Sequence, residues 1–110
     1  MERTKDSGIQ QKIVKARKEW GAFSEEDQML LLCGVTAELG ELATALRAEY
    51  VYKKPHIPDE DKSSLKHEMA DVAIFLYALA DKCNIDLDEA VHSKIEINNK
   101  RFTNTNKKSQ

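Results

Sequence analysis

Two pairs of acidic residues share one three-residue spacing, and they are the side chains best suited to chemistry. Glu38 and Glu41 form the first pair, and Glu68 and Asp71 form the second. An α-helix turns about 100° per residue, so acids three apart stand roughly 60° apart on one face and can bind the same ion. Each pair is therefore predicted to form a two-carboxylate clamp on its helix.

Both acidic pairs fall within the apolar stripe of a helical segment, where carboxylates are unexpected. Burying an ionised carboxylate is costly unless the charge is paired, protonated or given a cation. If the two helices pack against each other, the shared register brings four carboxylates to one point. The apolar residues on the same side as the acids are Leu31, Val35 and Leu42 in the first segment and Leu65, Val72, Phe75 and Leu79 in the second.

A divalent cation is the simplest partner for such a cluster. Basic residues are scarce nearby, since Arg47 lies well past the first pair and Lys66 faces another side of the second helix. Carboxylate oxygens suit Mg²⁺ or Mn²⁺ better than zinc. The alternative is that the acids lie on the solvated flanks of amphipathic helices, as most such spacings do. Two pairs in matching apolar registers favour the metal site.

Length and composition predict one soluble cytoplasmic domain over residues 1–110, with a core at about 8–102 and a flexible tail at 103–110. The net charge of −2 argues against binding to nucleic acid or anionic membranes. No apolar run is expected to reach the roughly 20 residues that span a bilayer. Cys33 and Cys83 lack metal-ligand spacing and a preceding secretory signal, so both are expected to be reduced core residues.

Helical periodicity predicts an all-α protein, because the only two prolines, Pro55 and Pro58, lie in one connection. Ser24 is expected to cap the second helix and Asp86 the fourth. The second and third helices are long enough to lie antiparallel in a four-helix bundle, with the first and fourth covering them. The four helices are expected at about 8–21, 24–53, 59–83 and 87–102, and the inner face of the fourth at Leu87, Ala90, Val91, Ile95 and Asn98.

The two long helices carry more apolar surface than one stripe requires. Residues 29–32 and 74–77 are apolar at four consecutive positions, which covers most of a helix circumference. Surface of this kind needs a partner, so at least a homodimer is predicted.

Four ordered motifs, spread over roughly residues 20–102, resemble the MazG-like all-α nucleoside triphosphate pyrophosphohydrolases, and most closely their small dCTP pyrophosphatase branch. A single acidic pair means little, but two such pairs followed by a Lys-Asn-Arg series form a specific signal. One departure is Ala37, where many members have a further Glu. The motifs are Ala37-Glu38-Leu39-Gly40-Glu41-Leu42, Glu68-Met69-Ala70-Asp71-Val72, Ile85-Asp86-Leu87 and Lys94-x-x-x-Asn98-x-x-Arg101-Phe102.

The resemblance implies an Mg²⁺-dependent enzyme that cleaves a nucleoside triphosphate between its α- and β-phosphates, and metal-activated water makes a protein nucleophile unnecessary. The products would be a monophosphate and pyrophosphate, and the usual role in such a family would be sanitising of the nucleotide pool, with regulatory nucleotides as alternative substrates. The assembly predicted from the apolar surface is a homodimer or homotetramer. The resemblance also implies residue roles: catalytic metal ligands at Glu38, Glu41, Glu68 and Asp71, and phosphate-binding residues at Lys94, Asn98 and Arg101.

The chemistry of a triphosphate agrees with these implied roles. Its negative charges need metal ions, which also lower the pKa of a water, and Glu41 is a candidate to orient that water as a base. Lys94 and Arg101 lie two turns apart on one helix face, so they can neutralise charge on the phosphates. On local evidence alone, a solvated basic face near a helix C-terminus explains these two residues equally well.

Recognition of the base is the least specified part of the predicted site. Trp20 and Phe23 resemble the base-stacking region of the dCTP pyrophosphatase branch, and Phe75 lies one turn after Asp71. For each aromatic residue, packing in the core is the alternative, because large aromatic side chains usually pack. The sequence therefore leaves the preferred base open.

Two other functions fit parts of the pattern. A di-iron carboxylate bundle needs Glu-x-x-His on two helices, and only Glu89 with His92 has that spacing, since His56 and His67 lack it. The main alternative without catalysis is a helical module that binds a structural cation or a protein partner. Hydrolysis of nucleotides to pyrophosphate distinguishes the enzyme from this module.

Overall fold

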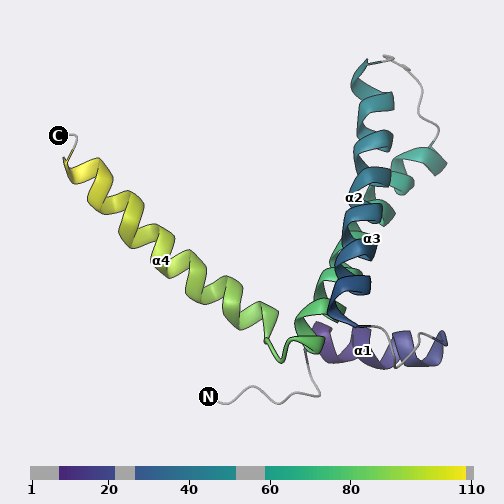
Figure 1. Cartoon of the computed structure of the whole chain (residues 1–110). Helices are drawn as coiled ribbons and strands as arrows, with labels where there is room; N and C mark the ends of the chain where they lie inside the picture. Colours follow the sequence, from purple (N-terminus) through teal and green to yellow (C-terminus); the bar gives the residue numbers. More distant parts are fainter. Residues whose placement is uncertain (1–7, 22–26, 52–58, 109–110) are drawn as a thin grey trace.

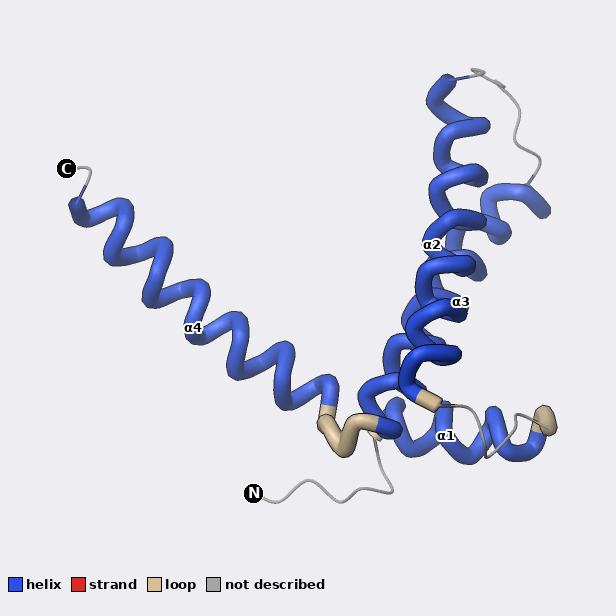
Figure 2. The backbone as a smooth tube through the Cα atoms, viewed as in Figure 1, coloured by secondary structure: helices blue, strands red, loops and turns tan. Residues whose placement is uncertain are grey.

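A computed structural model describes residues 8–21, 27–51 and 59–108, and its regular elements are all α-helices (Figures 1 and 2). The prediction of an all-α chain is thereby confirmed. The fourth helix is longer than expected, because residues 103–108 continue it where a flexible tail was predicted; no glycine or proline interrupts that stretch. The helices are α1 (Ile9–Glu19), α2 (Gln28–Val51), α3 (Asp59–Lys82) and α4 (Leu87–Lys108).

Aspartate side chains cap the N-termini of α2 and α4. The Leu30 N–H donates to Asp27 Oδ1 at 2.8 Å, so α2 begins under an Asp cap, while the predicted cap Ser24 lies outside the described residues. The Glu89 N–H donates to Asp86 Oδ1 at 3.2 Å, which confirms the cap predicted for α4. Both carboxylates also place negative charge at the positive end of a helix dipole.

The helices α2 and α3 lie side by side and form the main packed pair, and α1 packs across α3 (Figure 1). Gly34 permits a close approach between the long helices, because a Cβ at this position would lie 2.5 Å from two carbons of the Phe75 ring. The described core is small, and most of it lies where these three helices meet. Its buried apolar residues are Ile13, Leu31, Val35, Ala78 and Ala80.

The fourth helix leaves the other three and extends away from them (Figure 1). The expectation that it covers α2 and α3 is therefore wrong for the single chain, because the short turn after α3 sends it in another direction. Val91 and Ile95, predicted to face inward, are each 50% exposed, and Ala90 is also exposed. The radius of gyration is 18.0 Å, against about 13 Å for a compact domain of about 100 residues.

Much of α2 is also uncovered. Met29, Leu30 and Leu32 are exposed, and so is Cys33, which was expected in the core; both cysteines are free thiols, and Cys83 is partly exposed. Over Gln28–Ala48 the helix is long and apolar enough to cross a membrane, with a mean hydropathy of 1.5, contrary to the expectation from sequence. One such helix is weak evidence for a span, and this one carries the first acidic pair.

Candidate metal centre

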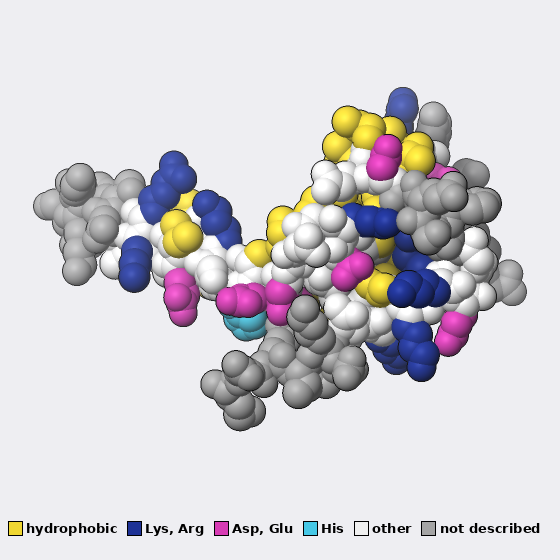
Figure 3. All heavy atoms as spheres, turned by 60° about the horizontal axis from the view of Figure 1, so that its bottom comes forward, with side chains coloured by type: hydrophobic (Ala, Val, Ile, Leu, Met, Phe, Trp, Pro, Cys, Tyr) yellow, Lys and Arg dark blue, Asp and Glu magenta, His cyan; other side chains and the backbone are white. Residues whose placement is uncertain are grey.

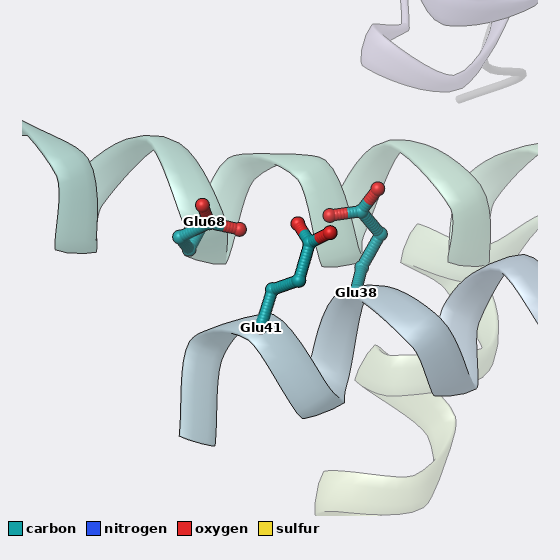
Figure 4. Close-up of side chains that lie close together, drawn as sticks. All are labelled: Glu38, Glu41 and Glu68. Atoms are coloured by element: carbon teal, nitrogen blue, oxygen red, sulfur yellow. The ribbon is translucent and has the colours of Figure 1, made fainter. Parts of the chain in front are cut away.

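Three of the four predicted acids come together between α2 and α3. Glu38 and Glu41 lie one turn apart on α2, and Glu68 faces them from α3 (Figure 4). One carboxylate oxygen from each residue lies within 4.8 Å of the others. We call these three residues the glutamate cluster. Its geometry follows from the shared register, because the i, i+3 spacing places both α2 acids on the face that packs against α3.

Asp71 lies at the edge of the glutamate cluster. It follows Glu68 by three residues on α3, and its side chain is exposed. Its charge is nevertheless close enough to raise the pKa of both Glu38 and Glu68. Asp71 thus belongs to the same electrostatic site, although its oxygens are not among the three that meet most closely.

Burial and mutual repulsion disfavour the ionised form of the glutamate cluster. Oε2 of Glu38 and Oε2 of Glu68 are buried and accept no hydrogen bond from any described group. Desolvation, followed by the charges of Glu41 and Asp71, raises the pKa of Glu38 above its ordinary value of 4.5. Desolvation and the same two charges raise the pKa of Glu68, with a smaller opposing effect from His67. Among the described groups, the effect of His67 is the smallest of those acting on Glu68, and it does not offset desolvation and the neighbouring negative charges.

A hard divalent cation fits this arrangement. Two orphaned carboxylate oxygens, converging with a third carboxylate, offer the all-oxygen ligand set that Mg²⁺ and Mn²⁺ prefer. Within the part of the chain that the structure describes, no other group of three or more acidic, His or Cys side chains converges in this way. Glu89 and His92, the pair that a di-iron site would require, are exposed on α4.

The predicted phosphate-binding residues lie on the diverging helix. Lys94 and Arg101 are exposed on α4, and Asn98 is partly exposed. The helix α4 leads away from the α2–α3 pair (Figure 1). The guanidinium of Arg101 lies 6.0 Å from the centroid of the neighbouring Phe102 ring. The single chain thus does not bring these donors to the glutamate cluster.

The three aromatic candidates have different environments. Trp20 is 67% exposed at the end of α1, so the alternative of a core role does not hold for it in the single chain. Phe23 lies outside the described residues. The Phe75 ring packs against Gly34, and the Arg17 guanidinium lies 5.2 Å from its centroid. Phe75 is thus partly exposed and packs against its neighbours, and its role in base binding stays a prediction.

Sequence reasoning missed Arg17 as a neighbour of this region. It lies on α1 and places a cation over Phe75, one turn beyond Asp71. Its position depends on how α1 crosses α3, and a basic residue on an amphipathic helix gives no sign of such a contact. No local signal in the sequence could have identified it.

Comparison with known proteins agrees with this arrangement. The profile of the MazG-like family matches residues 37–110, which include the whole glutamate cluster and all of α4. The chain belongs to the MazG-like family. This confirms the resemblance that the ordered acidic motifs indicated.

Several curated proteins are similar to this MazG-like chain. It is 33% identical over 89 residues to dCTP pyrophosphatase 1 of Mus musculus and 33% identical over 93 residues to dCTP pyrophosphatase 1 of Homo sapiens. Each match covers 79% of the chain but 51% of the relative, so the chain spans about half the length of these proteins. The uncharacterized protein YpjD of Bacillus subtilis (strain 168) is 36% identical over 77 residues, covering 68% of both chains.

Proposed function

We propose that this protein is a Mg²⁺-dependent nucleoside triphosphate pyrophosphohydrolase. It cleaves a nucleotide between the α- and β-phosphates to give the monophosphate and pyrophosphate, and it acts in the cytoplasm to sanitise the nucleotide pool. The observation that carries this proposal is the glutamate cluster, in which two buried carboxylate oxygens have no partner among the described groups. Membership of the MazG-like family supports the same reaction class.

The residues of the site divide into three roles. Glu38 and Glu68, with their orphaned oxygens, are the principal cation ligands, and Asp71 completes the set from the edge. A divalent cation supplies positive charge to the phosphate oxygens and lowers the pKa of a water. Glu41 is the most exposed member of the glutamate cluster, so it has the solvent access needed to orient the attacking water as a base.

A deoxynucleoside triphosphate is the proposed substrate, and dCTP is the first to test. Four of the similar proteins, among them those of Mus musculus and Homo sapiens, carry the name dCTP pyrophosphatase 1. The base itself has no assigned contact: Phe75 is occupied by packing, Trp20 is exposed, and Phe23 is not described. The preference therefore has to be measured across a panel of canonical and modified nucleotides.

The active assembly is proposed to be a homodimer or homotetramer. Large apolar side chains on α2 and α4 are exposed in the single chain, and burying them against a second copy would be favourable. On α4 the row formed by Lys94, Asn98 and Arg101 runs beside Val91 and Ile95, and in Figure 3 Lys and Arg side chains surround hydrophobic ones on this arm. The proposal includes that the second copy covers this stripe with its glutamate cluster beside the basic row.

The test is an incubation of the purified protein with each nucleotide and Mg²⁺, followed by separation of the products. Pyrophosphate and a monophosphate are expected, and chelation of the metal should abolish both. Release of inorganic phosphate with a diphosphate would contradict the proposed bond cleavage. No turnover of any nucleotide, together with tight Mn²⁺ binding, would instead support the non-catalytic metal-binding module.

A further inference from the structure

The turn between α3 and α4 decides where the fourth helix points. Asn84 has a φ of 57°, a left-handed conformation that ends α3. The Ile85 N–H donates to Ala80 O at 2.8 Å and the Asn84 N–H to Asp81 O at 3.0 Å, which is the pair of bonds of a Schellman motif. These bonds end α3, and the Asp86 cap begins α4 two residues later. The hydrogen bonds of the Schellman motif and of the Asp86 cap both lie within residues 80–89, so they do not tie the turn to α1 or α2.

A buried glutamine on α1 makes that connection. Gln10 is 9% exposed, and its Nε2 donates to Ile85 O at 2.7 Å. The Leu87 N–H donates back to Gln10 Oε1 at 2.9 Å. One side-chain amide therefore binds the backbone on both sides of Asp86. Leu87 is the first residue of α4, and its N–H is among those that a helix leaves without an internal partner.

We propose that Gln10 is a positioning residue that fixes the direction of α4 relative to α1 and α3. Only a side chain that both donates and accepts can make this pair of bonds, which explains a buried amide at this point of α1. Near the base of α4, the Tyr77 hydroxyl also donates to Asp88 Oδ1. Beyond its first turn α4 is mostly exposed. A small rotation at the turn between α3 and α4 therefore displaces the C-terminal residues of α4 by a large distance.

The consequence for catalysis rests on the proposed function. Lys94, Asn98 and Arg101 lie between two and four turns beyond the base of α4. Gln10 then acts on phosphate binding through the direction of the helix, while the glutamate cluster on α2 and α3 does not depend on it. A change at Gln10 should raise KM and leave the affinity for Mn²⁺ unchanged.

The test compares Gln10→Met, which removes both hydrogen bonds at similar volume, with Gln10→Glu, which keeps an acceptor for Leu87 but loses the donor to Ile85. The control is Gln28→Met, because the exposed Gln28 amide also donates to a carbonyl near the end of α3, at Lys82 O. Amide hydrogen exchange and residual dipolar couplings report on Leu87 and on the angle between α3 and α4.

In Gln10→Met the Leu87 amide should exchange about fivefold faster, the value expected for one lost hydrogen bond, and the α3–α4 angle should change. Gln10→Glu should show a smaller change and Gln28→Met none. Wild-type exchange and angle in Gln10→Met would overturn the proposal, as would a uniform acceleration across α2 and α3, which indicates general destabilisation. These readouts need no substrate. An inactive wild type would therefore count against the proposed function, while the readouts still test the positioning role of Gln10.

Discussion

The helices α2, α3 and α4 have similar lengths, but the α2–α3 pair and α4 present different side chains. The pair holds three carboxylates together, and two of their oxygens have no hydrogen-bond partner among the described groups. The fourth helix exposes apolar surface, with Val91, Ile95, Ile97 and Phe102 each at least half exposed. One region therefore gathers negative charge, and the other presents apolar surface to solvent.

This difference divides the proposed site into an acidic half on α2 and α3 and a basic half on α4. The acidic half is assembled by contacts between two neighbouring helices, so it needs no other molecule to form. The basic half is placed by a turn and by Gln10, and it points away from the acids. The following changes test whether the two halves differ in this way.

The largest effect is expected at the glutamate cluster. Glu38→Gln or Glu68→Gln should reduce kcat/KM at least about 100-fold. Loss of a residue that merely orients a metal ligand already costs up to about 100-fold, and loss of a ligand itself should cost no less. Both variants should remain folded, because each removes a buried charge that repels its neighbours. Steady-state hydrolysis of dCTP measures the loss. Glu96→Gln, on the exposed face of α4, is the matched control and should retain activity.

The contact between α2 and α3 can be tested with two glycines on one helix. Gly34→Ala should destabilise the protein by about 1–3 kcal/mol, because its Cβ would overlap the Phe75 ring. Gly40→Ala meets nothing within 4 Å and should instead stabilise α2 by up to about 1 kcal/mol through helix propensity. Urea unfolding measures both. Equal effects of the two substitutions would show that the helices do not approach closely at Gly34.

Metal binding should relieve the repulsion in the glutamate cluster. At neutral pH, Mg²⁺ at ten times its Kd should add about 1.4 kcal/mol to the free energy of unfolding. The raised pKa values mean that the metal-free folded state holds protons more tightly than the unfolded chain. Stability without metal should therefore rise as pH falls through these values toward 4.5, and the gain from Mg²⁺ should shrink over the same interval. Thermal unfolding with and without Mg²⁺ measures this dependence.

The smallest effect on folding is expected on α4. Ile95→Ser should change the stability of the monomer by less than about 0.5 kcal/mol, since the side chain is already 50% exposed. The same substitution should weaken the proposed oligomer, as measured by sedimentation at several concentrations. A large loss of monomer stability would mean that α4 packs within its own chain. Unchanged self-association would remove this helix from the interface.

Several features were predictable because they depend on short-range spacing. The four helices, the Asp86 cap and the common face of Glu38 and Glu41 follow from residue types within a few positions of each other. The ordered motifs were enough to indicate the family. The acidic pairs could be recognised from sequence alone, because charged residues on the apolar stripe of a helix are unusual in any fold.

Other features depend on the angles between helices, which no local pattern encodes. The sequence determined the helical class, the pairing of the acids and the family. The tertiary structure decided that Asp71 lies at the edge of the glutamate cluster, that Arg17 covers Phe75, and that Lys94 and Arg101 are carried away from the acids. The physical reason is that helix direction is set by a few turn and side-chain contacts, such as those of Gln10, between residues far apart in the chain.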